Sequence, residues 1–177
     1  ERSMLKLTTK DTVTGLSNRA IFIESLDKAI KACNDTYPSL LIVFIDIDNF
    51  KKINDSLGHT LGDVLLKEVA CRLTASLNSG FTIARLGADE FAILVPPYLY
   101  SGKTIFFAKQ TVDTVLQQFK TPFMLDNFET SLSVCCGLAI YPDNAYNCEN
   151  LMRSANSALN HAKKIGRNTY QFFDKDR

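Results

Sequence analysis

The chain has 177 residues, of which 46% are hydrophobic and 22% charged, and its formal net charge at pH 7 is +1. This composition is typical of a soluble globular domain with one core, and the near-zero charge argues against a general nucleic-acid or membrane-surface binder. No apolar run approaches the roughly 20 residues of a membrane span. The five cysteines form no C-x-x-C pair, so we expect reduced thiols, no zinc site and a cytoplasmic location.

The first half of the chain predicts helices around one central strand. Asn18 is a suitable N-cap for a helix, because apolar residues recur at helical spacing from there to Cys33. The branched apolar run at 39–47 predicts a central strand. We expect a short helix at 50–57 and a longer one that begins at Thr60.

The second half begins with a predicted β-hairpin at 81–96, where two β-rich runs flank a glycine-containing turn. A long strand is predicted at 129–142, a last helix that ends at Gly166, and an edge strand at 169–173. This order of elements favours an α/β (α+β) domain with a largely antiparallel sheet. Residues 101–119 predict a further helix, whose expected buried stripe is Ile105, Ala108, Val112, Val115 and Phe119.

Four acidic residues could form a metal site. Asp46 and Asp48 are two apart in the predicted central strand, so both face one side, and Asp89 and Glu90 lie at the hairpin turn. If the hairpin lies beside this strand, three or four carboxylates converge on a hard oxygen site suited to Mg²⁺ and phosphates. The alternative is a solvated acidic turn plus a strand-end aspartate bonded to the backbone.

Four segments of the chain resemble the diguanylate cyclase (GGDEF) family. "RLGADEF" at 85–91 resembles the signature, with alanine as its second residue, and "DTVTGLSNRAIF" at 11–22 resembles the entry motif. The segments at 44–66 and 155–168 are similar to the nucleotide-binding and closing motifs. The resemblance implies a nucleotide-cyclase, palm-like fold with five mostly antiparallel strands flanked by helices. The ending "YQFFD" is similar to members that continue into an EAL phosphodiesterase domain.

The resemblance also implies roles for individual residues. Asp46, the carbonyl of Ile47, Asp89 and Glu90 would hold Mg²⁺ or Mn²⁺, and Asp89 and Glu90 would be catalytic. The residues expected to contact GTP are Lys51, Asn54, Asp63, Gly87, Ala88, Lys163 and Arg167. Lys163 and Arg167 are four apart near a helix end, so both could reach one anion or could instead satisfy the helix dipole. Asp63 could instead close a capping box with Thr60.

Ala88 stands where a fully matching signature has its second glycine. At such a site glycine serves either a positive φ or the close approach of a nucleotide. Alanine costs about 1 kcal/mol in the first case and disturbs turnover in the second. Asn156 and Asn160 also depart from the closing motif, and the product-inhibition motif is absent at 78–81.

The resemblance implies an enzyme that works as a homodimer, condensing two GTP into cyclic di-GMP and pyrophosphate, weakly because of Ala88. The alternative is a catalytically degenerate GTP-binding domain that regulates an attached EAL phosphodiesterase. A scaffold that binds no nucleotide is the third possibility. We expect residues 1–10 to be a linker or helix end, 11–173 the domain, and 174–177 the start of a linker to a possible following domain, with no nucleic-acid partner and no membrane insertion.

Overall fold

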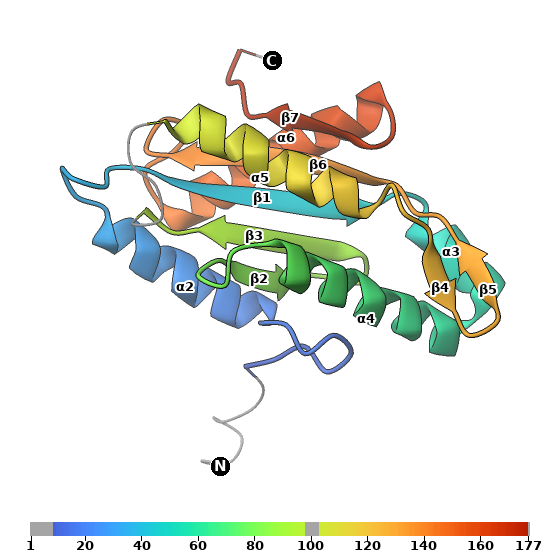
Figure 1. The fold of residues 1–177 in the computed structure, drawn as a ribbon. Helices are drawn as coiled ribbons and strands as arrows, with labels where there is room; N and C mark the ends of the chain where they lie inside the picture. Colours follow the sequence, from blue (N-terminus) through green and yellow to red (C-terminus); the bar gives the residue numbers. More distant parts are fainter. Residues whose placement is uncertain (1–8, 98–102, 177) are drawn as a thin grey trace.

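The computed structural model describes residues 9–97 and 103–176, and its centre is a five-stranded sheet of order β2–β3–β1–β6–β7 (Figure 1). All neighbouring strands run antiparallel except β6 and β7, which are parallel. The predicted sheet, with its C-terminal edge strand, is therefore confirmed. The strands are β1 Leu40–Ile47, β2 Thr82–Arg85, β3 Glu90–Val95, β6 Val134–Tyr141 and β7 Thr169–Phe172.

Helices cover both faces of this sheet (Figure 1). One core lies under α4 (His59–Ser76) and α5 (Thr104–Gln118), and the other lies under α2 (Arg19–Ala32) and α6 (Cys148–Ile165). The short helix α3 (Phe50–Leu57) follows β1 directly. Among the described residues, no helix combines the length and apolar character needed to cross a bilayer.

Strand β1 is the middle of the sheet, and all eight of its residues are buried. Val43 and Ile45 pack into the core under α4 and α5, whereas Ile42 and Phe44 pack into the core under α2 and α6. Because side chains alternate along a strand, a strand covered on both faces reads as a continuous apolar run. This explains why Asp46, near the end of that run, is buried.

Local signals predicted the helix ends well. Asn18 caps α2, since its side-chain oxygen accepts a hydrogen bond from the Ile21 amide at 3.0 Å. Helix α6 ends immediately before Gly166. The predicted stripe of α5 is wrong in one member, because Ile105 lies in the first turn and is 49% exposed. The predicted start of this helix, at 101–102, lies outside the described residues.

The long strand predicted at 129–142 is wrong, because this segment is divided between two sheets. Its first residues belong to β5 (Phe128–Thr130), which pairs with β4 (Phe123–Leu125) in a separate two-stranded sheet. The β4 residues Phe123 and Leu125 are buried and Met124 is 58% exposed, so a period-2 pattern is present. It spans only three residues, too few to be distinguished from a loop by periodicity.

Candidate functional site

Asp46 lies near the C-terminal end of β1, directly beside the start of β3. In the antiparallel register Asp46 is opposite Glu90. The backbone amide of Ile47 donates a hydrogen bond to the Asp89 carbonyl at 3.1 Å. The structure therefore brings together Asp46, Ile47, Asp89 and Glu90, although Glu90 is the first residue of β3 rather than part of the turn.

Lys163 reaches this group of acids from α6. Its ammonium forms an ion pair with Oδ2 of Asp46, which is 6% exposed. Burial lowers the pKa of Lys163, but the hydrogen bond to Asp46 and the charges of Asp89 and Glu90 outweigh it, so the net pKa is raised. Burial is also the largest effect on Asp46 and, with the neighbouring Asp89, raises its pKa to about 6 despite the opposing Lys163. Lys163 is therefore a firmly charged cation held by carboxylates.

The oxygen atoms at this point fit a divalent cation that is also bound by phosphates. Oδ1 of Asp46 is buried and has no hydrogen-bond partner in the described chain. Together with Asp89 and the Ile47 carbonyl, it supplies the hard oxygen donors that Mg²⁺ prefers. No three His, Cys, Asp or Glu side chains among residues 9–97 and 103–176 are arranged to hold a metal alone. Asp46, Asp89 and Glu90 therefore come together as expected, but by themselves they do not form a complete metal site, and Asp46 is paired with Lys163.

The turn between β2 and β3 contains Gly87 and Ala88. A Cβ atom on Gly87 would lie 2.6 Å from Oε1 of Glu90, so the Glu90 carboxylate lies directly against this glycine. Ala88 is exposed, and its φ is not positive, so the strain explanation for a glycine at this position does not apply. The alanine methyl can therefore affect function only through the space it occupies. Among the described residues, φ angles in the left-handed range occur at Gly15, Asn49, Gly58, Asp126 and Asn168.

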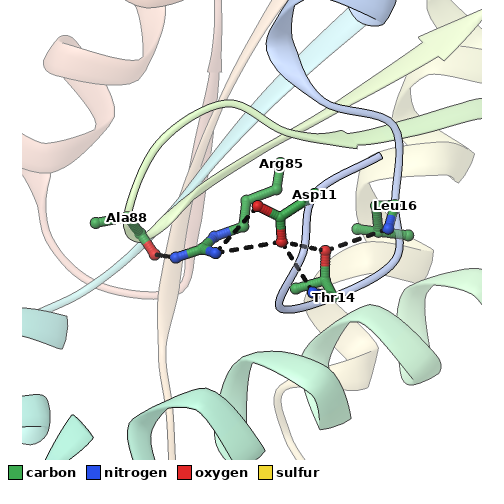
Figure 2. Close-up of polar contacts among 5 residues, drawn as sticks. All are labelled: Asp11, Thr14, Leu16, Arg85 and Ala88. Atoms are coloured by element: carbon green, nitrogen blue, oxygen red, sulfur yellow. Dashed lines mark hydrogen bonds and ion pairs between the residues drawn. The ribbon is translucent and has the colours of Figure 1, made fainter. Parts of the chain in front are cut away.

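Arg85 joins this turn to the N-terminal loop (Figure 2). Its Nη2 donates to the Ala88 carbonyl at 2.8 Å, and its Nη1 lies 3.2 Å from both carboxylate oxygens of Asp11. The amide and the hydroxyl of Thr14 each donate to Asp11 at 2.8 Å. The sequence motifs contain Asp11, Thr14 and Arg85 but do not predict that these residues meet, because Asp11 and Arg85 are 74 residues apart.

Asp11 is held in its ionised form by these contacts. Burial raises its pKa, but the hydrogen bonds from Thr14 and the charge and hydrogen bonds of Arg85 outweigh burial, so the net pKa is lowered. The side chains of Arg85 and Asp11 are 13% and 18% exposed. This ion pair is therefore shielded from water, and it links the loop preceding α2 to the backbone of the Ala88 turn.

Asn54 and Asp63 lie on the helix pair α3 and α4 that follows β1. The side-chain nitrogen of Asn54 is 3.0 Å from Nδ1 of His59. A Cβ atom on Gly62 would lie 1.9 Å from the side-chain oxygen of Asn54. A side chain at position 62 would therefore have to displace the Asn54 amide from its present position. Helix α4 has Gly58 as its N-cap, with no side-chain cap bond, so the alternative capping box of Thr60 with Asp63 is not formed.

The remaining predicted cations are Lys51 and Arg167, and both are exposed. Lys51 is exposed in the first turn of α3, and Arg167 is exposed in the loop after α6. Helix α6 ends at Ile165, so Lys163 lies in its last turn and Arg167 follows the helix. Joint contact of the two cations with one anion stays a prediction. The asparagines at 156 and 160 do not prevent α6 from bringing Lys163 to Asp46.

Comparison with known proteins gives one consistent result. Residues 8–169 match the family model described as diguanylate cyclase, GGDEF domain. The bifunctional diguanylate cyclase/cyclic di-GMP phosphodiesterase MucR of Pseudomonas aeruginosa is 35% identical over 173 residues, which are 98% of this chain and 24% of MucR. Diguanylate cyclase TpbB of the same species is 38% identical over 158 residues, covering 89% of this chain and 35% of TpbB. The chain thus spans about a quarter to a third of these relatives.

Solved structures agree with the family match. The isolated GGDEF domain of TpbB from Pseudomonas aeruginosa superposes with a TM-score of 0.85 at 33% identity, covering 93% of this chain and 94% of that one. An EAL/GGDEF domain protein from M. capsulatus gives a TM-score of 0.74 at 36% identity, covering 88% of this chain and 98% of that one. Both likenesses extend over almost the whole described fold.

Proposed function

This chain belongs to the diguanylate cyclase family of GGDEF domains, and from that premise we propose that two copies of it condense two GTP molecules into cyclic di-GMP. The reaction uses Mg²⁺ or Mn²⁺ and releases two pyrophosphates. Its rate is low because the Ala88 methyl occupies space beside the reacting groups. Each copy supplies half of the reaction site, so a dimer is required.

The observation that carries this proposal is the group formed by Asp46, Asp89, Glu90 and Lys163. A buried carboxylate oxygen without a hydrogen-bond partner, next to a second acid and a charged lysine, is costly to maintain in a purely structural site. The same arrangement suits a nucleotide triphosphate, because lysine and a divalent cation both neutralise phosphate oxygens.

In the proposed reaction, Lys163 exchanges part of its contact with Asp46 for the triphosphate, and Arg167 and Lys51 approach the same anion. The 3′-hydroxyl oxygen forms a bond to the α-phosphorus of the partner's GTP while the bond to pyrophosphate breaks. The hydroxyl proton passes toward the Asp89 carboxylate. When bound, the divalent cation lowers the pKa of the hydroxyl and neutralises charge on the phosphates.

Base recognition is assigned to Asn54 and Asp63. An amide offers both a donor and an acceptor, and a carboxylate accepts hydrogen bonds from the N–H groups of the guanine edge. The Asn54 side chain is already held by His59 and the space at Gly62, so it loses little conformational entropy when guanine binds. ATP lacks the N–H groups of the guanine edge that would donate hydrogen bonds to Asp63, so GTP is preferred.

A second function is also consistent with the position of Ala88. In it the domain binds GTP without turnover and regulates an attached EAL phosphodiesterase. Cyclic di-GMP phosphodiesterase NbdA of Pseudomonas aeruginosa is 35% identical over 98% of this chain, which covers 22% of NbdA. NbdA is named for hydrolysis of cyclic di-GMP rather than for its synthesis, and this likeness supports the second function.

The test compares the chain with its Ala88→Gly variant. Calorimetry measures GTP binding with and without Mg²⁺, and chromatography measures cyclic di-GMP formed with Mg²⁺ or Mn²⁺. We expect both proteins to bind GTP and both to form product, the variant faster by up to about a hundredfold. Because a dimer is needed, the rate per molecule should rise with protein concentration.

Each outcome has a distinct meaning. Product from Ala88→Gly but none from the parent, with GTP binding intact in both, establishes the regulatory function. GTP binding without product from either protein refutes the cyclase function and shows that Ala88 alone does not account for the missing turnover. No GTP binding in the presence of Mg²⁺, with normal secondary structure by circular dichroism, refutes both functions.

A further inference from the structure

The sequence places Asp48 in the central strand beside Asp46, but β1 ends at Ile47 and Asp48 lies in the turn that follows. Asp48 is bound to residues at the start of β6 rather than to the other acids. Its backbone amide donates to the Ser133 carbonyl at 2.9 Å, and the Ser133 hydroxyl donates to its Oδ2 at 2.6 Å. Its Oδ1 lies 3.3 Å from Sγ of Cys135. Asp48 is therefore anchored through its backbone and both carboxylate oxygens.

The anchoring of Asp48 determines the direction of the Ile47 carbonyl. This carbonyl and the Asp48 amide belong to one planar trans peptide and point in opposite directions. Since the amide is held by the Ser133 carbonyl, the Ile47 oxygen must point away from Ser133. On the other side of Ile47, its own amide is held by Asp89. The carbonyl proposed to bind the cation is thus fixed by two backbone bonds and by the Asp48 side chain.

Cys135 extends this network to the end of α6. Its Sγ is 3.1 Å from the Gly166 carbonyl as well as 3.3 Å from Asp48. Gly166 lies between Lys163 and Arg167, the two cations proposed to bind the triphosphate. The Cys135 side chain is fully buried, so water does not compete for these contacts.

The thiol of Cys135 keeps its proton under ordinary conditions. Burial, the hydrogen bond with Asp48 and the charge of Asp48 raise its pKa to about 12. Cys135 therefore serves as a neutral S–H donor shared between a carboxylate and a carbonyl. A thiolate in the same place would repel both of these oxygen acceptors.

We propose that Ser133 and Cys135 are positioning residues, which hold Asp48 so that the Ile47 carbonyl and the Lys163–Arg167 segment together form one Mg²⁺–triphosphate site. This inference rests on the proposed function and adds residues that touch neither the nucleotide nor the cation. It assigns Asp48 to alignment of the site rather than to metal binding.

The experiment uses the double variant Ser133→Ala/Cys135→Val, which removes both side-chain donors and adds about one methyl group of volume at position 135. Cys136→Val is the matched control, because Cys136 is equally buried and adjacent but packs in the core on the opposite face. The conservative variant Ser133→Thr/Cys135→Ser retains both donors. GTP affinity is measured with Mg²⁺ and with EDTA, and hydrogen exchange follows the Asp48 amide.

We expect the double variant to lose about tenfold in Mg²⁺-dependent GTP affinity, from two lost hydrogen bonds, and to keep its affinity in EDTA. Its Asp48 amide should exchange faster, while Cys136→Val matches the parent and Ser133→Thr/Cys135→Ser recovers most of the affinity. A general loss of structure would instead lower both affinities. If the double variant does not fold, Ser133→Ala alone is measured in the same way.

Three results would overturn the assignment. Equal Mg²⁺-dependent affinity and equal Asp48 exchange in the double variant and Cys136→Val would remove the positioning role while leaving the proposed function intact. An equal loss in Cys136→Val would show that the effect is general to the core. Failure of the parent chain itself to bind GTP would refute the proposed function first, and the positioning role with it.

Discussion

Gly87→Ala should separate folding from catalysis. The added Cβ would lie 2.6 Å from Oε1 and 3.5 Å from Cδ of Glu90, whereas ordinary contacts begin at 3.4 Å. The Glu90 carboxylate oxygen must therefore move by about 0.8 Å. A displacement of about 1 Å in a group aligned with the reaction can cost roughly a hundredfold in rate. We expect a loss of that order in turnover, with weaker Mg²⁺-dependent GTP binding.

Folding should be almost unaffected by the same substitution. The clash involves the end of a flexible side chain, and the φ of Gly87 is not positive, so alanine is allowed there. Alanine also reduces the conformational freedom of the unfolded chain, which favours folding by about 0.4–1 kcal/mol. The melting temperature should therefore stay within about 4 °C of the parent value, the shift expected for roughly 1 kcal/mol in a chain of this length.

A double-mutant cycle shows whether the loss acts through Glu90. Turnover and Mg²⁺-dependent GTP affinity are measured for Gly87→Ala, for Glu90→Gln and for the two combined. If the alanine acts by displacing the carboxylate, the combined variant is no worse than Glu90→Gln alone. Parent-level activity in Gly87→Ala, or losses that add in full, would contradict the placement of the Glu90 carboxylate at the reaction site.

Three further substitutions test other parts of the structure. Because the pKa of Asp11 is lowered in the folded chain, its ionised form stabilises the fold in full at pH values above its ordinary pKa of 3.8. This stabilisation is lost as the pH falls through the pKa of the folded state. Denaturant melts should show Asp11→Asn less stable by about 1–3 kcal/mol at pH 7, with this acid-dependent loss removed. An unchanged acid profile would show that ionised Asp11, with its Thr14 and Arg85 contacts, adds nothing to stability. Lys163→Met should weaken GTP·Mg²⁺ binding about tenfold or more but strengthen binding of Mg²⁺ alone, since no ammonium then competes for Asp46. Parallel changes in the two affinities by calorimetry would argue against this competition. Gly137→Ala should destabilise the fold by about 3 kcal/mol, because its Cβ would lie 2.3 Å from the α6 backbone. A melting temperature equal to the parent's would refute that packing.

Sequence patterns were sufficient for features that depend on near neighbours. The Asn18 cap, the buried run of β1 and the stop at Gly166 each follow from spacing within a few residues. The family motifs likewise pointed to Asp46 and to the Asp89–Glu90 pair. The β4–β5 hairpin was missed, because three-residue strands carry too little periodicity and their pairing depends on what covers them.

Tertiary structure alone decided which side chains meet. Lys163 contacts Asp46 and Arg85 contacts Asp11 across long stretches of chain, and Cys135 reaches Asp48 across 87 residues. Such contacts depend on strand register and on how α6 packs over the sheet, which are determined by the whole core rather than by any local run. The acids of the site could therefore be found from sequence. The ion pair of Lys163 with Asp46, the contacts of Arg85 with the turn and Asp11, and the absence of backbone strain at Ala88 required the folded chain.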